Sequence, residues 1–221
     1  MNNLTDNLTW IKDDLNGKVT LVAVSKNHPV SKIKEAYAAG QRNFDENKVQ
    51  ELMEKIDLLP KDIRWHLVGH LQTNKVKYIA PFIYMIHSLD SAKLAAEISA
   101  QAQKNERVID VLLQVRIAKE ETKFGLTEDD AEKIIKNQWA GDYPGISIRG
   151  LMGMATFTEN ESHVREEFKV LRDFFREVKE MHFTNEVSFD TLCMGMTGDY
   201  RIAIEEGSNM VRIGTAIFGS R

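Results

Sequence analysis

The sequence predicts an α/β fold, a single-domain (β/α)8 TIM barrel over residues 1–221. Short apolar runs rich in β-branched residues alternate with longer charged segments of helical period, and eight such runs are present. No linker rich in Pro, Gly or Ser divides the chain. Nearly continuous apolar strands are typical of a parallel sheet buried on both faces. An open doubly wound sheet is the alternative that the pattern leaves open.

The predicted elements follow in a regular order, beginning with a helical segment over residues 1–17. The eight apolar runs predict strands at residues 20–24, 42–44, 64–69, 83–89, 108–117, 146–154, 186–194 and 210–214. Segments with apolar residues three and four apart follow the first seven, and predict helices at residues 30–40, 47–59, 73–80, 91–104, 127–138, 161–181 and 197–207. Gly40 is expected to end the helix before it, and Thr127 is expected to cap the helix after it.

The composition excludes several classes of function. With 43% hydrophobic residues, 28% charged residues and a net charge of −4, the chain lacks the basic surface that nucleic acid requires. Its single cysteine, Cys193, allows no internal disulfide, and the reducing cytoplasm is the expected compartment. No signal peptide is evident and no apolar run approaches the ~18 residues of a membrane span, so no membrane partner is expected.

Lys26 comes almost directly after the first predicted strand, separated from it only by Ser25. In a barrel the active residues lie at the carboxyl ends of the strands. There the amine of Lys26 would be partly desolvated and available as a neutral nucleophile for an aldehyde. A lysine that extends into solvent beside a loop is the alternative.

Two loops that combine glycine and threonine follow the last two predicted strands. Thr197 lies in the first of them, and Gly214 and Thr215 lie in the second. Backbone amides and threonine hydroxyls bind phosphate, and barrels frequently build a phosphate site in these two loops. Glycines that serve only tight turns are the alternative.

Arg212 lies inside the eighth predicted strand, where its permanent charge needs an acceptor. That acceptor is either a carboxylate across the barrel or a ligand heteroatom. Asn47, near the end of the second strand, has a neutral amide that can hydrogen-bond a phenolic oxygen. An amine, a phosphate cradle and a donor to a ring nitrogen together indicate pyridoxal 5′-phosphate (PLP) as the cofactor.

No metal site is expected. His66 and His70 are four residues apart, but their segment is predicted to pass from a strand into a loop, and no HExxH motif is present. His66 and His87 are interpreted as satisfied residues of the core or barrel mouth. The methionines of 150–155 are interpreted mainly as core filling.

Eight short motifs carry a family resemblance over residues 20–221: "AVSK", "FDENKVQE", "WHLVGHLQTNK", "HSLDS", "KFGL", "GLMGM", "MGMTGDY" and "VRIGTAIFG". In the same order, they resemble the PLP homeostasis protein family. Members of that family are single-domain PLP-binding barrels similar to the N-terminal barrel of bacterial alanine racemase. As a set, the motifs are highly specific.

The resemblance implies a role for each candidate residue. Lys26 would form a Schiff base with PLP, Asn47 would lie near the pyridine ring and its 3′-oxygen, and Arg212 would face the pyridine nitrogen. The implied phosphate ligands are Thr197, Gly214 and Thr215. The chain departs from the family where Asp45 replaces the usual Gly and where Thr197 replaces the commoner Ser. An extra carboxylate at Asp45 would alter the local turn or electrostatics.

The expected function is therefore PLP binding in intracellular PLP homeostasis, with little or no catalysis. An Arg donor weakens the ring as an electron sink. Alanine racemase takes its second base, a tyrosine, from an additional domain that is expected to be absent from a chain ending at Arg221. Loss of such a base costs roughly 10²–10⁴ in rate. The alternatives are a PLP-dependent amino-acid racemase and a sugar-phosphate enzyme. The protein is expected to be a monomer, with apo PLP-dependent enzymes as candidate recipients of PLP.

Overall fold

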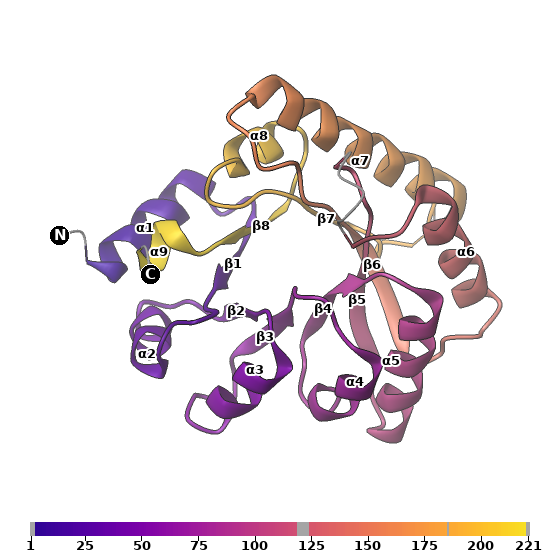
Figure 1. Ribbon diagram of the computed structural model, residues 1–221, viewed down its shortest axis with the longest axis horizontal. Helices are drawn as coiled ribbons and strands as arrows, with labels where there is room; N and C mark the ends of the chain where they lie inside the picture. The colour runs from indigo at the N-terminus through magenta and orange to yellow at the C-terminus, as the bar shows by residue number, and fades with distance from the viewer. Residues whose placement is uncertain (1–2, 119–123, 185, 220–221) are drawn as a thin grey trace.

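Eight parallel strands close into a barrel in the computed structural model, which describes residues 3–118, 124–184 and 186–219 (Figure 1). The strands are β1 (Thr20–Val24), β2 (Asn43–Glu46), β3 (Arg64–Leu67), β4 (Met85–Leu89), β5 (Ile109–Gln114), β6 (Ile146–Met152), β7 (Thr191–Cys193) and β8 (Met210–Ile213). Each strand pairs with the next in sequence, and β8 pairs with β1 to close the ring. The predicted barrel is confirmed, and the open doubly wound sheet is wrong.

Helices surround the ring of strands (Figure 1). They are α1 (Leu4–Leu15), α2 (Val30–Ala38), α3 (Val49–Ile56), α4 (Thr73–Ile79), α5 (Ala92–Lys104), α6 (Glu128–Trp139), α7 (Glu161–His182), α8 (Tyr200–Glu205) and α9 (Thr215–Phe218). The predicted cap of α6 is confirmed, because the Thr127 side chain accepts a hydrogen bond from the Asp130 amide at 3.2 Å. None of the helices in the described ranges has the length and apolar character that a membrane crossing requires.

Several element ends differ from the prediction. Strand β2 continues through Asp45 and Glu46, because Asp45 and Glu46 pair with β3. Strand β7 begins only at Thr191, since the chain before it turns where the Glu186 amide donates to the Phe183 carbonyl. Helix α9 was not predicted, because four residues are too few to display a helical period.

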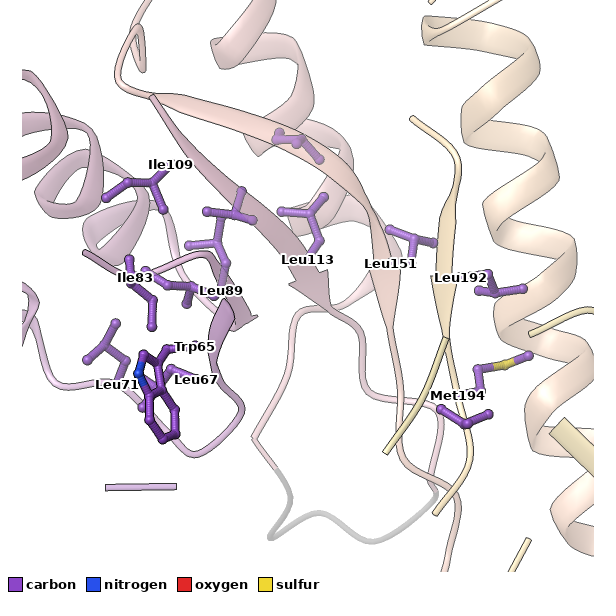
Figure 2. Packing of buried hydrophobic residues seen from close by; sticks show 14 of the residues in the cluster. Trp65, Leu67, Leu71, Ile83, Leu89, Ile109, Leu113, Leu151, Leu192 and Met194 are labelled. Carbon is purple, nitrogen blue, oxygen red and sulfur yellow. The ribbon is translucent and has the colours of Figure 1, made fainter. Parts of the chain in front are cut away.

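The hydrophobic core has two parts, as expected where strand side chains alternate between the inside and the outside of a barrel. The inner part contains Val22, Val68, Met85, Leu112, Met152, Cys193 and Met210. The outer and larger part fills the space between strands and helices, and Figure 2 shows one region of it, with Leu113, Leu151 and Leu192 on neighbouring strands. Polar side chains that replace apolar ones inside the barrel therefore need a partner or a ligand.

Candidate functional site

Two adjoining pockets lie at the carboxyl ends of the strands, with volumes of about 390 Å³ and 300 Å³. Lys26 and Arg212 line both of them. The larger pocket also contains Asp45 and Asn47, and the smaller one also contains Thr197 with the residues of the last loop, Gly214 and Thr215. The structure thus brings all six predicted site residues to one end of the barrel.

The bottom of the larger pocket holds Asp45 and Arg212, on the two strands that pair with β1. Their exposed fractions are only 1% and 3%. Asp45 Oδ1 and two guanidinium atoms of Arg212, Nε and Nη2, are buried without a hydrogen-bond partner among the described residues. Burial raises the pKa of Asp45 to about 7, although the nearby Arg212 charge opposes that rise. Buried polar atoms without partners are rare in native proteins, so these atoms are candidate contacts for a ligand or an ordered water.

A line of buried polar side chains runs through the barrel interior. His66 Nδ1 lies 2.8 Å from His87 Nε2, His66 Nε2 lies 3.3 Å from Asn43 Oδ1, and His87 Nδ1 lies 3.6 Å from Cys193 Sγ. Burial lowers the pKa of His66 to about 3 and that of His87 well below its usual value. Both histidines are satisfied core residues, as the sequence predicted.

Neutral histidines give this line a single hydrogen-bond direction. Asn43 Oδ1 can only accept, so His66 carries its proton on Nε2. His66 Nδ1 then accepts from His87 Nε2–H, and His87 Nδ1 accepts from the Cys193 thiol. Burial raises the pKa of that thiol to about 11, which keeps it protonated. Among the described residues, no group of three or more His, Cys, Asp or Glu side chains could hold a metal ion.

Asn47 reaches the larger pocket just after β2, where Gly69 allows the chain to pass closely. A Cβ atom on Gly69 would lie 2.1 Å from the Asn47 carbonyl oxygen, which no side chain could tolerate. The absence of a side chain at residue 69 therefore helps to place Asn47.

The smaller pocket joins the loops after β7 and β8. The Ala216 amide donates to Thr197 Oγ1 at 3.5 Å and so links the two loops. Gly195, at the start of the first loop, has a φ of 94°, and a Cβ there would meet the Tyr200 backbone at 2.8 Å. Thr197 and Thr215 of these loops line the pocket, and hydroxyl groups and backbone amides are the donors that a phosphate group requires.

The residues present fit PLP. The cofactor has an aldehyde for an amine, a ring nitrogen for a donor, and a phosphate for loop amides and hydroxyls. The pockets offer a matching group for each: the Lys26 amine for the aldehyde, the Arg212 nitrogens without a partner among the described residues for the ring nitrogen, and the two threonine loops for the phosphate.

Several pocket residues were missed by sequence reasoning. Gln114 ends β5 and lines the larger pocket, and its Nε2 donates to the Phe124 carbonyl at 3.0 Å. Its place at the end of a buried strand could have identified it. His70, which stacks on Phe124, and the fully exposed Phe157 also line the pocket, but no local pattern marks such loop residues. Lys123 of the "KFGL" motif lies outside the described residues.

The barrel, with its polar site at the strand ends, is of the alanine racemase N-terminal-domain class. The sequence-family model described as alanine racemase, N-terminal domain, matches residues 1–221. An alanine racemase from Bartonella henselae has the same fold, with a TM-score of 0.73 at 15% identity, and the match covers 98% of this chain and 58% of the racemase chain. At this identity the likeness shows the fold alone.

Closer relatives narrow the assignment. A pyridoxal phosphate homeostasis protein from Aquifex aeolicus is 40% identical over 202 residues, which are 91% of this chain and 86% of the relative. PipY of Synechococcus elongatus, solved without PLP, has a TM-score of 0.91 at 34% identity and covers 98% of this chain and 100% of PipY. The PipY structure with PLP bound has a TM-score of 0.87 at the same identity and coverage. The chain belongs to the pyridoxal phosphate homeostasis protein family.

Proposed function

We propose that this protein binds PLP, holds it as a Schiff base on Lys26, and serves intracellular PLP homeostasis with little or no turnover. The observation that carries the proposal is that one pocket contains both the Lys26 amine and buried Arg212, whose Nε and Nη2 have no hydrogen-bond partner among the described residues. The PipY relative was solved with PLP bound, which supports the same cofactor here. When bound, PLP supplies an aldehyde that captures amines reversibly.

Each candidate residue has a separate task in this proposal. Lys26 would provide the amine, and the Asn47 side-chain amide would donate to the ring's 3′-oxygen. Arg212, which lines the same pocket, would donate to the ring nitrogen. The phosphate is bound by the loop residues Thr197, Gly214 and Thr215.

Two observations favour binding over catalysis. The Arg212 guanidinium stays protonated and can only donate, so a ring nitrogen that accepts from it would remain unprotonated. An unprotonated ring would be a weak electron sink. Racemisation further needs a second base opposite the lysine. Alanine racemase uses a tyrosine as this base, and among the described residues the two pockets contain no tyrosine; besides Lys26 and Arg212, the titratable side chains that line the larger pocket are Asp45 and His70.

The proposal extends to the setting in which the protein works. Lys26 is only half-buried, so an amine from outside can reach the site and release the cofactor. We propose that the protein is a cytoplasmic monomer and that apo PLP-dependent enzymes receive the released PLP. The single cysteine, Cys193, is fully buried and free, in keeping with a reducing compartment.

An absorbance titration with PLP tests the proposal. Wild-type protein should develop the visible band of a PLP imine, and Lys26→Ala should abolish it. Lys34→Ala removes an exposed lysine of the neighbouring helix α2 and should leave the band unchanged. A full band in Lys26→Ala would contradict the proposal. Lys26-dependent racemisation of amino acids, followed by chiral chromatography, would instead favour the racemase alternative.

A further inference from the structure

A buried charge cluster lies beside the loop that carries Lys26. It consists of Glu46 at the end of β2 and Glu51 and Lys55 on α3, and we call it the Lys55 cluster. None of its three members is among the described residues that line the two pockets at the barrel mouth. The cluster therefore stands outside the binding machinery already assigned.

Lys55 is the centre of the cluster. Its Nζ donates to Glu46 Oε1 at 2.7 Å, to Glu51 Oε1 at 2.7 Å and to the Ser25 carbonyl at 3.1 Å. Lys55 is 7% exposed and Glu46 is fully buried. All three ammonium hydrogens thus have an acceptor, and one of these acceptors belongs to the residue before Lys26.

The two carboxylates bind the residues on both sides of Lys26. The Ser25 hydroxyl donates to Glu46 Oε1 at 2.7 Å, and the backbone amide of Asn27 donates to Glu51 Oε1. Asn27 has a φ of 62°, in the left-handed region that asparagine adopts more readily than most residues other than glycine. The cluster therefore holds the chain before Lys26 through a side chain and a carbonyl, and the residue after it through its backbone amide.

Stability alone does not explain this arrangement. Burying an ammonium with carboxylates costs desolvation, and well-packed apolar residues of similar volume often serve a fold equally well. Burial raises the pKa of Glu46 to about 7, against the hydrogen bonds from Lys55 and Ser25, and its Oε2 has no partner among the described residues. Such a costly group is best explained by the geometry that it imposes.

We propose that the Lys55 cluster is a positioning device for Lys26. By fixing Ser25 and Asn27, it holds the Lys26 backbone so that the amine enters the space shared by the two pockets. Glu46, Glu51 and Lys55 act through their neighbours and do not contact the cofactor. The inference rests on the proposed function, because it concerns how Lys26 captures an aldehyde.

The test uses pyridoxal as well as PLP. Pyridoxal lacks the phosphate, so its capture depends on the lysine and the ring pocket and not on the threonine loops. Each purified variant is incubated with the aldehyde and reduced with borohydride, and mass spectrometry of peptides measures the rate of labelling at residue 26. Rates are compared at equal folded fractions, measured by circular dichroism.

The matched control is Glu206→Gln. Glu206 is a buried carboxylate, 5% exposed, that accepts hydrogen bonds from Arg165 and Arg172 beside helix α8. Loss of the Glu206 charge should lower the free energy of unfolding, as the loss of one partner of a buried ion pair does. Glu206 contacts neither Ser25 nor Asn27, the two neighbours of Lys26. If the Lys55 cluster had a purely structural role, its variants and Glu206→Gln would change the labelling rate at residue 26 alike.

Lys55→Met should slow the labelling of Lys26 by about 10- to 100-fold with both aldehydes, because a misplacement of about 1 Å is sufficient for such a loss. Glu51→Gln, a milder change on the same helix, should slow it about 3- to 10-fold, the effect of weakening one charge-assisted hydrogen bond. Glu206→Gln should stay within about twofold of wild type, since sites that share no partners with Ser25, Lys26 or Asn27 are expected to act independently of them.

Three results would overturn the inference. The first is wild-type labelling in folded Lys55→Met, and the second, decisive if that variant does not fold, is wild-type labelling in Glu51→Gln. The third is an equal loss in Glu206→Gln, because the effect would then be general destabilisation. If wild-type protein itself fails to label at Lys26, the proposed function is contradicted, and not the positioning role alone.

Discussion

Asp45 and Arg212 extend into the barrel from the two strands that flank β1, and each retains a buried polar atom without a partner among the described residues. Burial is the main cause of the raised pKa of Asp45, about 7, and Arg212 only moderates it. The bottom of the pocket therefore carries a carboxyl group whose ionisation the folded state resists.

Replacement of that carboxyl group should stabilise the apo-protein at high pH. The folded state keeps the Asp45 proton because its pKa is raised to about 7, whereas the unfolded chain releases it near the ordinary pKa of 3.8. The contribution of Asp45 to the free energy of unfolding is therefore greatest at low pH and is lost as the pH rises through this window. Asp45→Asn cannot ionise, so its free energy of unfolding should exceed that of wild type above pH 7 by on the order of 2–4 kcal/mol.

Urea unfolding at several pH values checks this expectation. The difference between Asp45→Asn and wild type should shrink toward zero by about pH 4, below the window of the shift. A difference that is independent of pH, or that grows as the pH falls, would show that Asp45 is ionised in the folded protein. The attraction of the nearby Arg212 charge would then outweigh the cost of burial.

His66 and His87 should both remain neutral across the physiological range. Burial holds the pKa of His66 near 3 and that of His87 well below its usual value. Nitrogen-15 NMR should therefore show no titration of either ring between pH 8 and pH 5, with the proton of each on Nε2. Spectra of His66→Gln and His87→Gln assign the two signals. A ring that titrates in this range, or carries its proton on Nδ1, would refute the assigned hydrogen-bond direction.

Gly69→Ala should disturb the pocket through the backbone. The new Cβ would lie 2.1 Å from the Asn47 carbonyl oxygen, so the chain must move at Asn47. We expect a loss of on the order of 2–4 kcal/mol in the free energy of unfolding, as for other severe steric changes, and weaker PLP binding. Gly198→Ala, whose Cβ would meet nothing within 4 Å, should leave the unfolding of the apo-protein almost unchanged. Equal stability of the two variants would argue against the close approach.

Thr197→Val should separate recognition of the phosphate from capture of the aldehyde. Thr197 presents its hydroxyl beside the last loop, where it also accepts from the Ala216 amide. Loss of one hydrogen bond to a charged group costs about 1.5–3 kcal/mol, which corresponds to roughly 10- to 150-fold weaker PLP binding. Affinity for pyridoxal should change little. Titrations with both aldehydes give the comparison, and an equal loss for both would remove Thr197 from the phosphate site.

Local patterns were sufficient for the architecture. The apolar runs and the helical period predicted eight strands and the seven helices between them, because burial on both faces of a barrel strand leaves a continuous apolar signature. Thr127 was recognisable as a cap because capping is decided within four residues. The seventh strand was predicted over residues 186–194, but β7 covers only Thr191–Cys193. An apolar run does not reveal where a turn interrupts the strand pairing.

The site was predictable only where it follows from position in the barrel or from the resemblance. Lys26, Thr197 and Thr215 all follow strand ends, and the structure indeed brings them together. The contacts of Lys55 with Ser25, and the common environment of Asp45 and Arg212, join residues that no sequence period connects. These relationships depend on which strands flank β1 and on the packing of α3, which only the closed barrel defines.

Mass spectrometry after borohydride reduction of the PLP-treated protein tests the central claim most directly. Reduction makes the link between an amine and PLP permanent, so that the modified residue can be read from its peptide. The account predicts one pyridoxyl-phosphate group on Lys26 and none on this peptide in Lys26→Ala. Modification spread over surface lysines, with Lys26 unlabelled, would contradict it.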